Sequence, residues 1–321
     1  MKKLLSLIIL LICFSLAFSQ TISFESEIKE AQTLFENSEF LSSANILESV
    51  VQKDPKNTYA LNELGVVYLK IGKYDDAENC ANKVINLDRT IKKSYYVRGI
   101  AYYYLGKYKE SVKDLSCFLQ FYPQKTDALN SRGGAYLALE KYNLAEKDFS
   151  SAINYSLMMN SQSPAVYYSN RAYTFIKMKK FPEAIKDLDI CIKLNPNDLD
   201  SLVKRSYSYN QLGKYKEALA DAKKTLQLTP NSEEAHRNYG EVLLSSGDYE
   251  NAITEFSIVL NMATDDALSY YLRGCAYAKL NDFQNAMNDF NKSLELEPNN
   301  ENCIQAKTLI LNEIETFSKK G

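Results

Sequence analysis

The feature that most limits how this chain can fold is an internal repeat with a period of 34 residues. Segments 64–74 and 98–108 share a Gly, a Tyr and a closing Gly-Lys-Tyr, and segment 132–142 continues the same frame. Self-similarity at a fixed period is the signature of a repeat architecture. The frame divides the chain into eight repeats with a five-residue insertion at 160–164: residues 24–57, 58–91, 92–125, 126–159, 165–198, 199–232, 233–266 and 267–300.

The repeat frame also accounts for most of the glycines and prolines. Position 8 of the repeat holds Gly65, Gly99, Gly133, Gly240 and Gly274, and position 15 holds Gly72, Gly106, Gly213 and Gly247. Position 32 holds Pro55, Pro123, Pro196, Pro230 and Pro298. A small residue at position 8 permits close helix packing, Gly at 15 suits a left-handed turn after a helix, and Pro at 32 ends the second helix.

Each repeat has two apolar stripes at helical spacing, at positions 4, 7, 8 and 11 and at positions 17, 20, 24 and 27. One such helical hairpin cannot bury both faces alone and must stack on its neighbours. The sequence therefore predicts an all-α fold. We expect residues 20–300 to form one continuous solenoid of eight hairpins, and residues 301–321 to form a capping helix and tail.

The capping helix is expected over residues 301–318. Its predicted inward stripe consists of Cys303, Ala306, Ile310, Ile314 and Phe317. A solenoid needs a one-sided terminal helix to close its last apolar face.

These repeats resemble the tetratricopeptide repeat (TPR) family over residues 24–300. The resemblance implies a right-handed superhelical solenoid of helix-turn-helix units with a concave groove. The chain departs from the family pattern at position 4, where the usual Trp is replaced by Leu61, Tyr95, Leu129, Tyr168 or Tyr270.

An arginine and an aspartate occur together within five repeats. Position 7 is Arg where position 23 is Asp, and the other three repeats lack both residues. An Arg in a packing stripe needs a counter-charge. We therefore predict structural ion pairs between the two helices of each hairpin, in preference to a basic stripe that reads an acidic ligand: Arg98 with Asp114, Arg132 with Asp148, Arg171 with Asp187, Arg205 with Asp221 and Arg273 with Asp289.

Residues for partner binding follow from the TPR resemblance, which places the groove at positions 2, 5, 9, 12 and 13 of each first helix. The candidates are Tyr59, Asn62, Lys70, Lys93, Tyr96, Tyr103, Tyr104, Asn130, Tyr173 and Tyr207. Tyrosine suits contact with a peptide because its rigid ring has apolar faces and a polar tip. The alternative is that these rings pack between repeats. Because the groove positions of repeats 6 and 7 include Asp200, Glu234 and Glu241, we expect binding to centre on repeats 2–5.

Composition and motifs argue against enzymatic chemistry. The chain has one histidine, His236, and no Cys-x-x-Cys, phosphate loop, nucleophile elbow or defined pair of carboxylates. We expect no catalytic residue, metal site or cofactor. The near-balance of 38 basic and 40 acidic residues argues against a nucleic-acid partner.

The first nineteen residues have the pattern of a secretory signal. A basic start at Lys2 and Lys3 precedes an apolar run over residues 4–18, and small residues stand before Gln20. We expect cleavage and export to the periplasm or cell envelope, or to the secretory pathway if the source is eukaryotic. A membrane partner is expected only if the signal stays uncleaved.

The sequence thus favours an exported, non-enzymatic scaffold or adaptor that binds a protein or peptide along its concave groove. Two alternatives remain open. One is a holdase-like chaperone accessory for unfolded exported chains, and the other is a structural assembly component of the cell envelope.

Overall fold

The computed structural model describes residues 24–159 and 164–318, with side chains up to residue 314. The predicted signal segment and the side chain of Phe317 lie outside the described residues. The chain divides into two compact units, at residues 1–162 and 163–321, and each unit is described by itself. The boundary falls within the predicted insertion at 160–164. The single array of eight hairpins remains a prediction.

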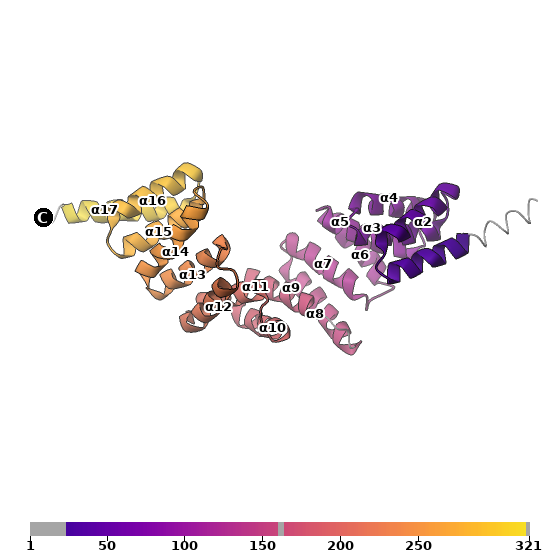
Figure 1. Ribbon diagram of the computed structural model, residues 1–321, viewed down its shortest axis with the longest axis horizontal. Helices are drawn as coiled ribbons and strands as arrows, with labels where there is room; N and C mark the ends of the chain where they lie inside the picture. The colour runs from indigo at the N-terminus through magenta and orange to yellow at the C-terminus, as the bar shows by residue number, and fades with distance from the viewer. Residues whose placement is uncertain (1–23, 160–163, 319–321) are drawn as a thin grey trace, which may run out of the picture. The chain divides into compact units, whose positions relative to one another are not determined.

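The first unit is a stack of helical hairpins (Figure 1). A helix over residues 24–36 comes first. The helices that follow it are α2 (Phe40–Lys53), α3 (Thr58–Lys70), α4 (Tyr74–Leu87), α5 (Lys92–Tyr104), α6 (Tyr108–Leu119), α7 (Thr126–Ala138) and α8 (Tyr142–Met158). Each of α3 to α7 packs on the next helix, and the first helices of successive hairpins touch, α3 with α5 and α5 with α7.

The second unit repeats this arrangement. Its helices are α9 (Ala165–Lys177), α10 (Phe181–Leu194), α11 (Leu199–Gln211), α12 (Tyr215–Leu228), α13 (Glu233–Ser246), α14 (Tyr249–Met262), α15 (Ala267–Lys279), α16 (Phe283–Leu296) and α17 (Glu301–Ser318). Consecutive helices pack on one another, and α11 touches both α9 and α13. Throughout the described residues the regular structure is helical, and the predicted all-α fold is confirmed.

Every hairpin turn places a residue with positive φ at position 15. Four are glycines, with φ from 70° to 91°, and the others are Ser38, Glu140, Lys179 and Asn281, with φ from 57° to 66°. After each of them an N–H group bonds back five residues, as Lys107 does to the carbonyl of Tyr102 at 2.8 Å. This pattern satisfies a carbonyl that the helix end leaves free and turns the chain into the second helix.

The glycines at position 8 stand where the two helices of a hairpin approach closely. A Cβ atom on Gly133 would lie 2.8 Å from the Phe149 ring, and one on Gly240 would lie 2.8 Å from the Phe256 ring. Both phenylalanines are completely buried. Glycine is therefore required at these positions for ring packing rather than for backbone conformation.

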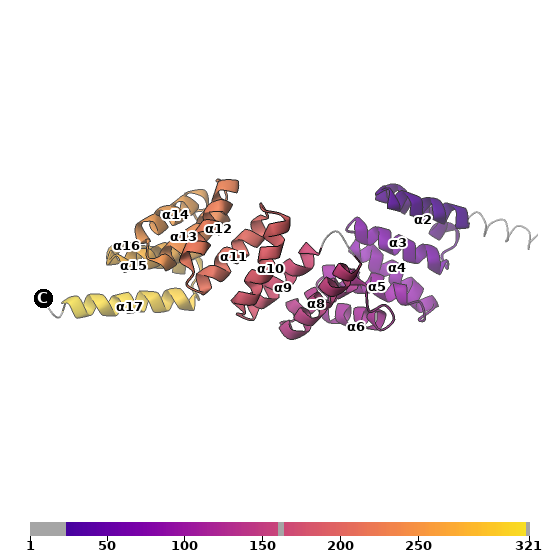
Figure 2. The same cartoon turned by 90° about the horizontal axis from the view of Figure 1, so that it is seen from below.

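The terminal helix α17 caps the second unit over part of its length. Cys303 and Ile310 are buried against α16, as the predicted inward stripe requires, but Ile314 is 39% exposed. The expectation that Ile314 lies on the inward stripe is therefore wrong, and the buried contact of α17 with α16 runs from Cys303 to Ile310. Both views show the C-terminal end of α17 projecting past α16 (Figure 1, Figure 2).

Candidate binding groove in the second unit

All five arginine–aspartate pairs predicted within hairpins have short contacts in the structure. The distances from Arg Nε to Asp Oδ2 are 2.6 Å for Arg98–Asp114, 2.7 Å for Arg132–Asp148, and 2.8 Å for Arg171–Asp187, Arg205–Asp221 and Arg273–Asp289. Each aspartate is buried, and each guanidinium donates a second bond to the other carboxylate oxygen. The hydrogen bond to Asp289 raises the pKa of Arg273, against the opposing effect of burial. The geometry is that of paired structural charges.

Four of these arginines also bond the preceding hairpin, a contact that the sequence reasoning missed. The Nη1 atoms of Arg98, Arg132, Arg205 and Arg273 donate to Asn82, Ser116, Asp189 and Ser257, at 2.8, 3.0, 2.7 and 2.9 Å. Each acceptor lies 16 residues before its arginine, at position 25 of the earlier repeat. A polar residue at that position is the sequence signal for this contact.

Aromatic rings flank the same guanidinium groups. The Arg98 guanidinium lies 5.7 Å from the Tyr95 ring centre and 5.6 Å from that of Tyr102. Arg273 lies between Tyr270 and Tyr277 in the same way. Tyrosines at positions 4 and 11 thus pack against the arginine at position 7, which identifies a structural role for them.

Repeat 233–266 has neither the arginine nor the aspartate. A contact between a histidine and a glutamate joins its two helices instead. His236 Nδ1 lies 2.6 Å from the Glu255 carboxylate, and Nε2 lies 3.0 Å from the Pro230 carbonyl oxygen. The His236 side chain is buried among the helices of its hairpin. The only histidine of the chain therefore contributes to packing.

In the first unit, the candidates on α3 have different environments. Tyr59 is 54% exposed, and its hydroxyl accepts a hydrogen bond from Gln32 at 2.8 Å. Asn62 is buried and donates to the Thr58 carbonyl oxygen at 3.0 Å. Lys70 is exposed at the end of the helix. None of these three candidates lines either of the two pockets described below.

The candidates on α5 are mostly occupied by neighbouring side chains. Lys93 forms an ion pair with Glu63, and the Tyr96 ring lies 5.0 Å from that of Phe118. Tyr103 packs where a Cβ on Gly134 would meet its hydroxyl at 2.7 Å.

Two further candidates of the first unit lie on α5 and α7. Tyr104 is 56% exposed and stacks on Tyr74 with 4.4 Å between ring centres, and Asn130 is half-buried on α7. For Tyr103 the structure favours the packing alternative, whereas Tyr104 presents one face to solvent.

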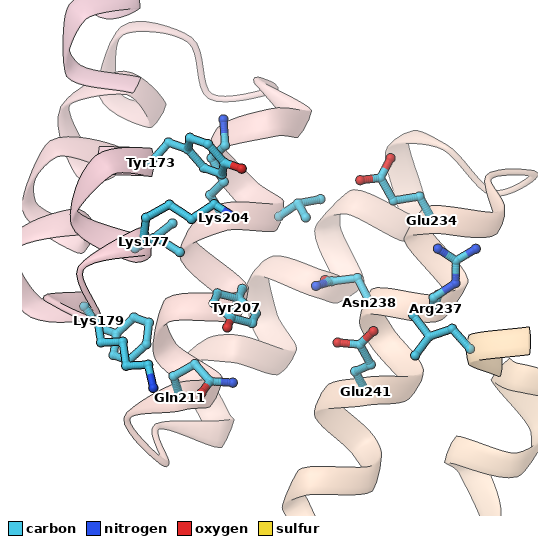
Figure 3. Close-up of a pocket in the computed structure, with 14 residues that line it drawn as sticks. Tyr173, Lys177, Lys179, Lys204, Tyr207, Gln211, Glu234, Arg237, Asn238 and Glu241 are labelled. Carbon is cyan, nitrogen blue, oxygen red and sulfur yellow. The ribbon is translucent and has the colours of Figure 1, made fainter. Parts of the chain in front are cut away.

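The last two candidates, Tyr173 and Tyr207, line a pocket of about 650 Å³ in the second unit. Figure 3 shows the pocket open between two groups of helices. One wall comes from α9, α11 and the turn before α10, and carries Tyr173, Lys177, Lys179, Lys204, Tyr207 and Gln211. The other wall comes from α13 and carries Glu234, Arg237, Asn238 and Glu241. A pocket of about 230 Å³ in the first unit lies between the helix 24–36, α2 and α3.

The cationic wall is organised around Tyr173. The ammonium groups of Lys177 and Lys204 lie 5.2 and 5.3 Å from its ring centre. Asp200 forms an ion pair with Lys204 and accepts a hydrogen bond from Ser169 at 3.2 Å. Asp200 therefore holds a lysine in place on this wall.

The anionic wall combines a paired cation with an unpaired carboxylate. Arg237 donates to Asp266, at 3.1 Å from Nε and 2.9 Å from Nη2. Burial raises the pKa of Glu241, although the nearby Arg237 acts in the opposite direction. A cleft with a perturbed carboxylate is a candidate functional site.

The pocket lies in repeats 5–7, although the sequence favoured repeats 2–5 for binding. The acidic charges of Glu234 and Glu241 predict weaker binding in repeats 6 and 7, but both residues contribute to one wall of the pocket. Phe181 and Asn238 lie outside the positions predicted for the groove, whereas Gln211 stands at one of them, position 13. Periodicity places side chains on a helix face but does not indicate where neighbouring helices leave space between them.

The described residues contain no group of acidic, histidine or cysteine side chains able to hold a metal ion. Within the same residues, no helix has both the length and the apolar character needed to cross a bilayer.

Models of known protein families match parts of this chain. Two models described as tetratricopeptide repeat match this chain, one at residues 165–198 and 267–300 and the other at residues 34–92 and 209–274. Together they cover more than half of the chain. No curated protein matches the sequence.

Solved structures show the same fold at low identity. A chain of the APC/C hetero-tetramer Cut9–Hcn1 is 17% identical with a TM-score of 0.59, over 89% of this chain and 55% of that chain. The C-terminal part of a TPR repeat-containing protein from Cytophaga hutchinsonii is 18% identical with a TM-score of 0.58, over 76% of this chain and 98% of that one. A tetratricopeptide repeat protein from Parabacteroides merdae is 21% identical with a TM-score of 0.52, over 79% and 98%.

This chain thus spans about half the length of the Cut9–Hcn1 chain that it matches. Repeat period, hairpin geometry and family models agree. The chain belongs to the tetratricopeptide repeat family.

Proposed function

We propose that this protein is an exported, non-enzymatic adaptor that binds an extended segment of a protein partner in the groove between α9, α11 and α13. Tetratricopeptide repeats serve in general as protein-interaction scaffolds and typically bind proteins or peptides. The observation that carries the proposal is the open pocket of about 650 Å³, lined by two tyrosines and by charges of both signs.

The two tyrosines support this proposal because they are accessible and oriented. Tyr173 is 36% exposed and Tyr207 is 38% exposed. The Tyr207 ring is held edge-on by Phe181, with 6.1 Å between ring centres. A pre-oriented aromatic ring gains contact area with little loss of conformational entropy.

Site-specific photo-crosslinking tests the proposal. A photoreactive phenylalanine analogue is placed at Tyr207 in the full chain, in cells of the source organism, with the same substitution at the exposed Tyr59 of the first unit as the matched control. We expect one stoichiometric partner to crosslink from position 207 and not from position 59, and Tyr173→Ala to reduce the yield. Equal crosslinking from both positions would refute binding in this groove.

The same experiment separates the two alternatives. Many unfolded clients crosslinked from both positions would identify a holdase-like accessory. Crosslinks that form only when the analogue is moved to α17 would identify an assembly component that uses its end.

Export is tested separately on the full chain. We expect mass spectrometry of the protein from its own cells to find a mature N-terminus at Gln20 in the envelope or secreted fraction. An intact Met1 in the cytoplasmic fraction would contradict export and leave the groove proposal standing.

A further inference from the structure

Glu241 is a carboxylate without a bonding partner on the groove wall. Its side chain lines the pocket from α13 and is half-buried. Within the described part of the chain its carboxylate forms no hydrogen bond or ion pair. Taking a carboxylate partly out of water without a partner costs free energy. A bound cation would offset part of that cost.

The nearest cation on the same helix does not fill that role. Arg237 lies one turn before Glu241, but its guanidinium bonds Asp266, at 3.1 and 2.9 Å. Burial still raises the pKa of Glu241 in the presence of Arg237. The charge of Arg237 is thus neutralised by Asp266, and Glu241 remains available to a ligand.

Two neighbours of Glu241 add features that suit an organic cation. Figure 3 shows Asn238 and Glu241 side by side on α13, facing Tyr207 and Gln211 on α11. The Oδ1 atom of Asn238 is buried without a hydrogen bond, and a half-turn of its amide would present that acceptor to the groove. The Tyr207 ring, held by Phe181, offers a face of the kind that attracts ammonium and guanidinium groups.

We propose that Glu241, the Asn238 amide and the Tyr207 ring form a subsite for the side chain of a lysine or arginine in the bound partner. A single carboxylate beside an aromatic ring matches this chemistry, whereas metal cations need several oxygen ligands. The lysines of the pocket lie on the opposite wall, where Lys204 is paired with Asp200 and lies with Lys177 beside Tyr173. The subsite rests on the proposal that this groove binds protein, and it adds the chemistry that the groove selects.

The test uses capped tripeptides as probes on the full chain. Acetyl-Gly-Lys-Gly-amide and acetyl-Gly-Arg-Gly-amide are titrated while the side-chain amide of Asn238 and the carboxyl carbon of Glu241 are followed by NMR, and acetyl-Gly-Gln-Gly-amide is the neutral control. We expect saturable shifts with the two cationic probes only. Glu241→Gln should weaken their binding at least about tenfold, because it removes the charge from a desolvated ion pair.

The matched control variant is Glu250→Gln, which removes an exposed carboxylate from α14, outside the pocket. We expect it to bind the cationic probes as the natural protein does. Circular dichroism of both variants checks that the fold is kept. Equal shifts with the glutamine probe, no shift with any probe, or unchanged binding by Glu241→Gln would overturn the subsite.

These outcomes are distinct from failure of the proposed function. A partner that crosslinks from position 207 equally well in natural and Glu241→Gln backgrounds would keep the groove and reject the cation subsite. The absence of any crosslinked partner would reject the groove, whatever the tripeptides do.

Discussion

Arg132 and Asp148 face each other across the hairpin of α7 and α8 in a two-pronged ion pair. The Nε–Oδ2 and Nη2–Oδ1 distances are both 2.7 Å, and the aspartate is 4% exposed. The third donor, Nη1, bonds Ser116 of the preceding hairpin at 3.0 Å. The pair therefore holds its own hairpin together and attaches it to the one before.

Removing one partner of this pair is expected to destabilise the first unit strongly. Asp148→Asn leaves a guanidinium buried without a counter-charge, which costs about 3–5 kcal/mol. Replacing both residues by apolar ones, Arg132→Met with Asp148→Leu, should cost less than Asp148→Asn alone. Urea unfolding followed by circular dichroism checks this, and strictly additive losses would contradict a coupled pair.

Substitutions at position 15 of two different hairpins should change the free energy of unfolding in opposite directions. Gly106 has φ of 73°, so Gly106→Ala is expected to lower the free energy of unfolding by about 1–2 kcal/mol. Glu140 has φ of 57° at the equivalent turn, so Glu140→Gly should raise it by up to about 1 kcal/mol. Thermal unfolding of the two variants measures both effects, and destabilisation by Glu140→Gly would show that its side chain stabilises the turn.

The stability of the second unit should carry a pH dependence that comes from Glu241. Burial raises its pKa above the 4.5 of an unfolded chain, so the folded protein binds more protons than the unfolded one between these two values. The contribution of Glu241 to stability therefore falls as pH rises through that window. Glu241→Gln removes the fall, so the variant should gain stability over the natural protein as pH increases from below 4.5. Urea unfolding at a series of pH values measures this difference, and a constant difference would contradict it.

Cys80, which is buried, and Cys275, which is half-buried, should both be inert towards alkylation in the folded protein. Burial raises the pKa of Cys80 and of Cys275 to about 11, so little reactive thiolate forms near neutral pH. We expect iodoacetamide to modify both residues slowly until denaturant is added, as read by mass spectrometry of peptides. Rapid modification of Cys80 in the native protein would show that α4 opens locally.

Sequence periodicity predicted the helical hairpins well. The repeated glycines and prolines mark turns and helix ends, and these depend only on residues close together in the chain. The Arg–Asp contacts follow from the same frame, because both residues belong to one hairpin. The bond from Arg98 to Asn82 was missed because it depends on how two hairpins stack, and its acceptor changes type from repeat to repeat.

The groove was harder to predict for a related reason. Tyrosine content favoured the first repeats, but Tyr103 packs against Gly134, a contact that requires the spacing between α5 and α7. Glu241 was considered by its charge alone. Its significance comes from burial beside an arginine already bonded to Asp266, and neither fact follows from its position in the repeat.

The junctions between successive hairpins of the second unit differ in whether an arginine bonds across them. Arg205 connects α11 to the hairpin before it, and Arg273 connects α15 to the hairpin before it. At the junction between them, Tyr239 stands in the arginine position, and apolar packing of Ala218, Ala222 and Val242 joins the hairpins. That junction is also where α11 and α13 form the two walls of the groove. The two walls are joined instead by this apolar packing and by a hydrogen bond from the Asn210 amide to the Ser245 hydroxyl at 3.1 Å. Arginine contacts thus hold the neighbouring junctions of this unit, whereas the junction that forms the groove depends on packing and a neutral bond.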